Sequence, residues 1–424
     1  MTKDPTELDH LLADIRWWVG IDWASQAHRA CLLDARGRIL GQESFAHSGD
    51  GLAALRLWIL EKTDATPAQI AVAIEVPHGP VVETLLEHGF AVFAINPKQL
   101  DRFRDRFTPA GAKDDARDAQ ALGDSLRTDA HCFRHLRRDE PLVIELREAS
   151  RLAWELRQER VRLANRLRDQ LLRYYPQALG LTDDLGAEWF LALWSMAPTP
   201  AKARRLRASS VARLLKTHRI RRHDAQSALA LLRQTPLPVA PGVTEAAGAH
   251  IRSLIPRLRL VNQQIGETDR QLEALCTRLD QEPLPGQTGE QRDVAILRSS
   301  PGIGRIVIAA LLGEAYQAWQ RRDYHALRLM SGAAPVTKQS GKHKLVVMRH
   351  ACVPRLRWAV YHWARVAIQQ DPHSPSRYHQ LRSRGHSHGR ALRTIADRLL
   401  KVACAMLITQ TPYDPNRHAT HPAA

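Results

Sequence analysis

Acidic residues are few in this chain relative to basic ones. Its 424 residues include 44 Asp and Glu against 61 Lys and Arg, which gives a formal net charge of +17 and a pI near 10.2. Such an excess of positive charge favours a polyanionic partner, above all nucleic acid, although a basic surface without any partner is the alternative. The length predicts two or three domains. Hydrophobic residues make up 44% of the chain, enough for sizeable cores.

Cysteine and long apolar runs are also scarce. The five cysteines are scattered, odd in number and without a CxxC pair, which argues against a disulfide framework and against a zinc site. No apolar stretch is long enough to span a bilayer, and we expect no membrane partner. The polar start, residues 1–10, does not read as a signal peptide. We therefore expect a cytoplasmic protein associated with the nucleoid.

The first third of the chain alternates between strand and helix patterns. Three strands come before the first helix, and two further helix–strand units follow, in the order βββαβαβ. This order predicts a mixed sheet of ribonuclease H type, in which the first and fourth strands are neighbours; rival α/β folds begin by alternating β and α. Strands are expected over residues 17–22, 28–34, 38–46, 69–76 and 90–95, with helices over 48–62, from Pro80 to Gly89 and after Asn96-Pro97.

Four acidic residues carry the candidate chemistry. Asp22 and Glu75 each end an apolar run that reads as a strand, and Asp115 and Asp118 share one face of a predicted helix. Convergent carboxylates repel one another and raise one another's pKa, so they need a cation, and Mg²⁺ is the natural one. Two ions can stabilise both the attacking and the leaving oxygens when a phosphodiester is cut. Singly, each acid reads as a cap or a surface charge; jointly, they favour a site.

The middle of the chain reads as long helices. Residues 141–175 keep a three-four apolar spacing that Arg160 interrupts, and residues 250–279 form a second such stretch. This spacing predicts a coiled coil or helical hairpin, either within the chain or between protomers. Residues 180–245 between them are helical and basic. The predicted domains are residues 1–140, 141–282 and 292–411, with a disordered tail over 412–424 and the best linker candidate at 282–286.

Two segments of the last third are candidates for contact with nucleic acid. Residues 297–304 read as a helix-hairpin-helix turn in which Gly302 and Gly304 let backbone N–H groups approach a phosphate, with a plain helix connection as the alternative. Residues 335–344 form a small, polar and basic loop around Ser340. From its local sequence this loop favours contact with a phosphate over nucleophilic chemistry. The candidate cations are Lys338, Lys342, Lys344 and Arg349.

These pieces together resemble a known family. The chain is similar to the DEDD transposases of insertion sequence 110 type, now seen as bridge-RNA-guided recombinases, and to the related pilin-gene invertases. The resemblance covers nearly the whole chain, in order. The matching motifs are Gly20-Ile21-Asp22, Glu75 with Gly79 after it, Lys113-Asp114-Asp115-Ala116-Arg117-Asp118-Ala119, Pro301-Gly302-Ile303-Gly304 and Gln339-Ser340-Gly341.

The resemblance implies an α/β RuvC-like domain, then a coiled coil, then a mostly helical transposase domain. It implies that Asp22, Glu75, Asp115 and Asp118 hold Mg²⁺, and that Ser340 attacks a DNA phosphate to form a covalent phosphoserine link. It also implies a homodimer or tetramer in which carboxylates and serine come from different protomers. An element-encoded bridge RNA would pair with the donor and target DNA and supply the specificity.

The chain departs from this family at two places. Asp114 adds a fifth carboxylate where a small hydroxyl residue is common, and residues 348–352 lack the expected glycine. One alternative function is a metal-dependent nuclease of Holliday-junction type without covalent serine chemistry. Another is a nucleic-acid-binding protein without catalysis. Residues 19–25 also resemble the phosphate loop of actin-like sugar kinases, but no second Gly-rich loop follows at a suitable place.

Overall fold

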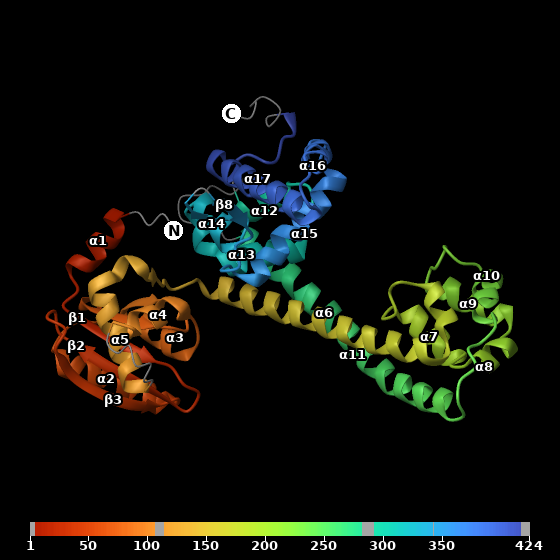
Figure 1. The fold of residues 1–424 in the computed structure, drawn as a ribbon, viewed down its shortest axis with the longest axis horizontal. Coiled ribbons are helices and arrows are strands. Elements are labelled where there is room, and N and C mark those ends of the chain that lie inside the picture. Colours follow the sequence, from red (N-terminus) through yellow and green to blue (C-terminus); the bar gives the residue numbers. More distant parts are fainter. Residues whose placement is uncertain (1–4, 107–113, 282–291, 342, 417–424) are drawn as a thin grey trace. The chain divides into compact units, whose positions relative to one another are not determined.

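The computed structural model describes residues 5–106, 114–281, 292–341 and 343–416. It forms two compact units, an N-terminal unit of residues 1–140 and a C-terminal unit of residues 141–424 (Figure 1). None of the helices in the described ranges is long and apolar enough to cross a membrane.

The N-terminal unit is built on one mixed sheet with the strand order β3-β2-β1-β4-β5-β6. The first three strands form an antiparallel meander, β1 runs parallel to β4, and β4 runs parallel to β5. The predicted ribonuclease H order and the neighbouring first and fourth strands are therefore confirmed. The strands are β1 Trp17–Asp22, β2 Ala27–Leu33, β3 Ile39–Ala46, β4 Ile70–Ile74, β5 Ala91–Ala94 and β6 Arg134–His135.

Two elements of this unit were not predicted. The strand β6, antiparallel to β5, has only two residues and too few side chains for an alternation to be read. A first helix precedes the sheet, in a segment that the sequence identified only as polar. The helices are α1 Pro5–Ala13, α2 Gly49–Thr63, α3 Pro80–Glu87, α4 Pro97–Arg104 and α5 Asp115–Asp129, with short 3₁₀ turns at Pro67–Gln69 and Ala130–Cys132.

Strand alternation divides the core between the two faces of the sheet. Val19 and Ile21 of β1 point to the core that α2 and α3 close, together with the larger side chains of β4. On the opposite face β1 presents Gly20 and β4 presents Ala71 and Ala73, which leave room for α5. Small residues on this face therefore decide where α5 can lie.

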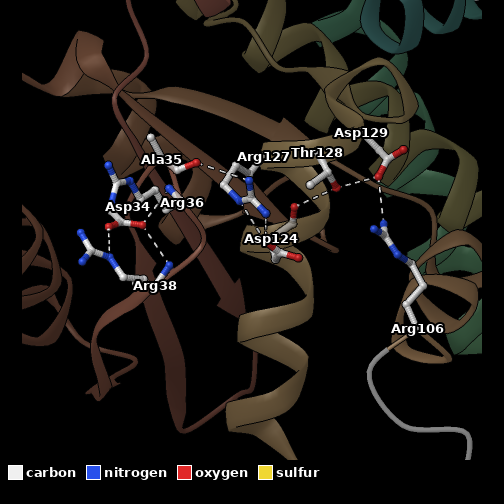
Figure 2. A network of polar contacts seen from close by, with 9 residues as sticks. All are labelled: Asp34, Ala35, Arg36, Arg38, Arg106, Asp124, Arg127, Thr128 and Asp129. Carbon is white, nitrogen blue, oxygen red and sulfur yellow. Dashed lines mark hydrogen bonds and ion pairs between the residues drawn. The ribbon is translucent and has the colours of Figure 1, made fainter.

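The C-terminal end of α5 is fixed by a polar network (Figure 2). The Arg127 guanidinium donates to Asp124 Oδ1 at 2.6 Å and to the Ala35 carbonyl oxygen, in the turn between β2 and β3, at 3.4 Å. One turn further on, Arg106 donates to Asp129 at 2.9 Å and joins the end of α4 to α5. These contacts hold α5 along the sheet.

The C-terminal unit is organised by two long helices, α6 Pro141–Tyr174 and α11 Val243–Gln281, which pair antiparallel within the chain (Figure 1). Cross-contacts run in opposite order along them, with Arg278 3.3 Å from Glu145 and Arg160 2.7 Å from Asn262. The sequence had left pairing within the chain and between protomers open. Arg160, which interrupts the apolar seam, also binds Asp184 at 2.8 Å, so its charge is compensated.

Two separate cores form along this helix pair. One joins the C-terminal half of α6 and the N-terminal half of α11 to α7 Glu188–Met196, α8 Pro200–Arg205, α9 Ala208–Thr217 and α10 Ala225–Leu232, with a 3₁₀ turn at Pro176–Leu181. The other joins the opposite halves to α12 Asp293–Arg298, α13 Arg305–Gln320, α14 Tyr324–Met330, α15 Pro354–Gln370, α16 Ser374–Ser383 and α17 His388–Thr409. The predicted mixed α/β domain with a mostly helical remainder is confirmed.

The predicted disordered tail begins with an anchored segment. The Tyr413 backbone N–H donates to Ser299 Oγ at 2.7 Å, and the Tyr413 hydroxyl donates to Asp371 at 2.5 Å. The Pro415 carbonyl oxygen lies 3.0 Å from His373 Nε2. Residues 412–416 therefore pack on the domain, whereas 417–424 and the predicted linker at 282–286 lie outside the described residues.

Candidate carboxylate site and serine hairpin

Asp22 and Glu75 leave the sheet at the same edge. Ile21 of β1 is paired with Ile74 of β4 in parallel register, so the next residue of each strand is one of the two acids. By alternation Asp22 lies on the face of β1 that presents Gly20, toward α5. The structure therefore brings together the two acids that the sequence placed at the ends of neighbouring strands.

Helix α5 adds further acids to this edge because it packs directly against Gly20 of β1. A Cβ added to Gly20 would lie 1.9 Å from the Ala119 carbonyl oxygen and 2.5 Å from the Gly123 nitrogen, so only glycine allows this approach. The approach places Asp118, next to Ala119, against the end of β1. Asp118 is 1% exposed, while Asp115, one turn earlier, is exposed to solvent.

The pKa of Asp22 depends on the charges of the other three acids. The pKa of Asp22 is raised from 3.8 to about 6, first by burial and then by the charges of Asp118, Asp115 and Glu75, in that order of effect. The positive charge of Arg104 acts in the opposite direction. All three other acids are thus close enough to repel a negative charge on Asp22, as the sequence predicted.

Arg104 is a member of the site that the sequence did not reveal. Its guanidinium Nε lies 2.6 Å from Asp118 Oδ1, and its Nη1 lies 2.6 Å from Asp101. In the sequence it reads as one of several alternating surface charges near the end of α4. No local pattern shows that its side chain reaches a buried carboxylate from another helix.

The donor set suits a hard divalent cation. The second oxygen of Asp118, Oδ2, is buried without a hydrogen-bond partner, and carboxylate oxygens are the ligands that Mg²⁺ prefers. Within the described ranges, however, no three His, Cys, Asp or Glu residues are grouped in a way that could hold an ion. The acids gather at one edge, and the cation that contacts Asp118 is Arg104.

Asp114, the extra acid of the motif, has a local structural role. It is the N-cap of α5 and accepts a hydrogen bond from the Arg117 backbone N–H at 2.9 Å, and its other oxygen lies 3.1 Å from Arg117 Nε. This geometry satisfies an N–H group that the first turn of a helix leaves unpaired. Lys113 of the same motif lies outside the described residues.

Ser340 lies at the tip of a β-hairpin and not in the loop predicted from its polar sequence. Strands β7 Val336–Ser340 and β8 His343–Val347 pair antiparallel, with Ser340 opposite His343 and Lys338 opposite Leu345. Ser340, Lys338 and His343 therefore share one face of an exposed hairpin, whereas Lys344 projects from the other. Lys342 is not described.

The remaining residues predicted to contact nucleic acid differ in how accessible they are. Gly302, at φ +90°, faces α15, where an added Cβ would lie 3.0 Å from the Trp363 carbonyl oxygen. Gly304 is the N-cap residue of α13 and has open space around it. Arg349 Nε donates to the Ala334 carbonyl oxygen at 3.3 Å. Packing thus explains Gly302, while Gly304 remains accessible to a ligand.

A carboxylate edge on a ribonuclease H-type sheet, in a strongly basic chain, is typical of the class of enzymes that act on nucleic acid. Comparison with known proteins narrows this class. Residues 19–176 match the DEDD transposase model of IS110 type, and residues 294–379 match the transposase model of the IS116/IS110/IS902 family.

Individual relatives agree with both models. The candidate mini-circle transposase of IS117 from Streptomyces coelicolor is 31% identical over 412 residues, 94% of this chain and 95% of that protein. A 44.8 kDa protein of insertion element IS116 from Streptomyces clavuligerus is 26% identical over 415 residues, 96% of this chain and 98% of that protein. The candidate transposase y4uE of Sinorhizobium fredii is 58% identical over 209 residues, 49% of this chain and 58% of that protein.

The chain belongs to the IS116/IS110/IS902 family of insertion-sequence transposases. Transposases act on DNA, which they cut and rejoin, so the family assignment disfavours the alternatives of a stand-alone junction nuclease, a sugar kinase and a non-catalytic binding protein.

Proposed function

We propose that this transposase cuts and rejoins DNA with Mg²⁺ held by Asp22, Glu75, Asp115 and Asp118 and with Ser340 as the nucleophile. The observation that carries the proposal is the parallel register of Ile21 with Ile74, which brings Asp22 and Glu75 to one sheet edge beside Asp118. A divalent ion, when bound there, would neutralise the acids and polarise the phosphate oxygens of DNA; two ions fit the number of carboxylates.

The chain's own residues prepare this site. Asp22 and Glu75 are fixed by the sheet, and Asp118 is fixed by the glycine contact between β1 and α5. Asp115 is exposed one turn before Asp118, and in this proposal it faces the substrate. Arg104 compensates the charge of Asp118 at Oδ1. The other oxygen, Oδ2, has no hydrogen-bond partner and would be available to hold an ion.

Ser340 provides covalent chemistry in this proposal. Its Oγ attacks a DNA phosphorus, the Oγ–P bond forms, and the bond from phosphorus to the leaving deoxyribose oxygen breaks. The serine proton passes to a base, and the leaving oxygen takes up a proton. Rejoining reverses the step with a second DNA end. The exposed hairpin tip supports this role, because Lys338 and His343 share its face and can hold a phosphate beside the hydroxyl.

The serine proposal is tested by trapping the covalent intermediate. Wild-type protein is expected to give a protein–DNA adduct that survives denaturing electrophoresis, and Ser340→Ala is expected to lose both adduct and strand exchange. Thr337→Ala, on the opposite face of the same strand, should retain both. Cleavage by Ser340→Ala at the wild-type rate would leave a metal-only mechanism in its place.

We further propose that an element-encoded bridge RNA supplies the sequence specificity by base pairing, while the protein binds backbone. The basic charge of +17 supports binding of a second nucleic acid besides DNA. A discrete noncoding RNA from the ends of the element is expected to copurify with the protein and to be required for strand exchange. Full activity of nuclease-treated, RNA-free protein would contradict this prediction.

A further inference from the structure

A dense cluster of positive charge lies in a segment of the sequence that contains neither the carboxylates nor the serine. Residues 189–244, between Glu188 and Glu245, contain ten Lys and Arg and a single acid, Asp224, a net charge of +9. This short stretch therefore carries more than half of the +17 of the whole chain. It forms the helices α7 to α10 at one end of the α6–α11 pair (Figure 1).

Two of these ten cations have structural partners. Arg233, at the end of α10, donates to the carbonyl oxygens of Ala203 at 3.3 Å and Leu206 at 2.8 Å and so closes the end of α8. The Arg222 guanidinium lies 5.3 Å from the centre of the Trp189 ring. The single acid, Asp224, accepts from the Ser227 backbone N–H as the cap of α10 and does not form an ion pair with the cations around it.

The other eight cations are exposed, and none forms an ion pair within the described residues. They lie on α8, at the N-cap of α9, on the outer side of α9 and in the turn that follows it. Together these eight residues form the α8–α9 basic surface. Its members are Lys202, Arg204, Arg205, Arg207, Arg213, Lys216, Arg219 and Arg221.

Arg219 occupies a backbone position that usually favours glycine. It has φ +56°, in the left-handed region, where the chain leaves α9: Ile220 N donates to Leu215 O at 2.8 Å and Arg219 N to Lys216 O at 3.1 Å. Glycine is the favoured residue at this position of a helix end. Among the described residues, a second arginine with positive φ, Arg322, pairs both terminal nitrogens of its guanidinium with Asp293, whereas Arg219 forms no ion pair.

The apolar face of α9 limits the kind of partner. Its apolar side chains Val211, Leu214 and Leu215 are buried in the core that α7 and α10 share. A helix that inserts into a lipid surface would need such a face turned outward. What α9 and α8 leave outward is guanidinium and ammonium groups, which match regularly spaced phosphates.

We infer that the α8–α9 basic surface is a binding site for the phosphodiester backbone of a nucleic acid, separate from the carboxylate site and the serine hairpin. Binding here needs neither metal nor the serine, so it stands apart from the proposed chemistry. Both DNA and RNA present the same phosphates, and the experiment distinguishes them.

The test measures the affinity of the full chain for a short DNA duplex and for an RNA duplex of equal length, by fluorescence anisotropy in EDTA. The double variant Arg204→Ala/Arg205→Ala is expected to bind about tenfold more weakly and to reduce the slope of log affinity against log salt by roughly 0.9 per lost phosphate contact. The duplex whose affinity falls more in the variant is the ligand of this surface. Equal decreases in affinity for DNA and RNA would identify a site that binds both.

The variant Arg219→Gly separates binding from folding. Because glycine suits the left-handed position, its melting temperature is expected to equal or exceed that of the wild type, while affinity falls about threefold. The control Arg36→Ala/Lys62→Ala removes the same charge as the double variant from exposed positions of the N-terminal unit and should change affinity less than about twofold.

Three outcomes would overturn the inference. Equal losses in the control and in Arg204→Ala/Arg205→Ala would mean that net charge alone is measured. Unchanged affinity and unchanged salt slope in both α8–α9 variants would leave the surface without a nucleic-acid ligand. Loss of binding to vesicles with anionic headgroups, with nucleic-acid affinity intact, would assign the surface to a membrane.

Discussion

At the scale of single residues, Asp22 is the position where the proposed function opposes the stability of the fold. A pKa of about 6 means that the folded protein disfavours the ionised carboxylate relative to the unfolded chain, where the pKa is near 3.8. The resulting loss in the free energy of unfolding is absent below pH 4, where Asp22 is protonated in both the folded and the unfolded state. It grows between pH 4 and 6 and is fully present above pH 6.

The Asp22→Asn variant should therefore be more stable than the wild type without metal. We expect a gain of about 1 to 3 kcal/mol at pH 8 that fades as the pH falls to 4, measured by denaturant unfolding. Addition of Mg²⁺ should stabilise the wild type and not the variant. A gain that is independent of pH would show that the charge of Asp22 is not its source.

The Asp34→Asn substitution should have the opposite effect on stability from Asp22→Asn. Hydrogen bonds from the Arg38 and Arg36 backbone N–H groups and from the Arg38 guanidinium hold the pKa of Asp34 below its usual value, against a smaller effect of burial. That stabilisation is present above pH 4 and is lost as the pH falls through the lowered pKa. The variant should therefore be less stable than the wild type at pH 8.

The sequence patterns pointed to the four acids of the candidate site but not to Arg104, the basic residue that contacts Asp118. Asp22 and Glu75 each follow an apolar run, and Asp115 and Asp118 lie one turn apart, so both signals are local in the sequence. The contact of Arg104 with Asp118 joins α4 to α5 across a segment that lies outside the described residues. A tertiary contact of this kind leaves no periodicity to read.

At the scale of elements, the contact between β1 and α5 positions the site. The sequence used Gly20 only as part of a motif, because the neighbour that makes glycine necessary is a helix about a hundred residues further along the chain. The order of the strands could be predicted from the succession of strand and helix patterns along the chain. The hairpin of Ser340 was not, because its small and basic side chains are exposed on both faces and no apolar alternation marks it.

Substitution of Gly20 by alanine should separate α5 from the sheet. The added Cβ would lie 1.9 Å from a backbone oxygen that cannot move alone, so we expect a loss of about 3 kcal/mol or more in the stability of the N-terminal unit, with loss of DNA cleavage. Gly49→Ala, in open space at the start of α2, is the matched control and should be near neutral. Urea unfolding that does not distinguish the two variants would contradict the close contact.

At the scale of the whole molecule, the two proposed catalytic groups belong to different compact units. The four acids lie in residues 1–140, and Ser340 lies in residues 141–424. The family resemblance predicts that a working site combines acids of one protomer with the serine of another. Composition and charge predicted the nucleic-acid partner, but no sequence pattern can decide which protomers share a site.

Mixing two inactive variants tests this arrangement. Asp22→Asn and Ser340→Ala proteins are each expected to be inactive alone. Together, if the site is shared, a mixed assembly contains one site with wild-type acids and serine, so strand exchange should return to about a quarter to a half of the wild-type rate, measured on paired DNA substrates. Continued inactivity, with mixed assembly verified by crosslinking, would place both groups of a site in one protomer.

The shared use of α6 and α11 by two cores has a consequence for the order of folding. The core around α7 to α10 draws on residues between Leu163 and Val261, whereas the other core joins Leu142 to Leu407. Loop closure over the shorter separation is the less costly entropically, and synthesis delivers those residues first. The α8–α9 end should thus fold on the ribosome while the serine-bearing half is still being made, so that its basic surface forms before the enzyme can act on DNA.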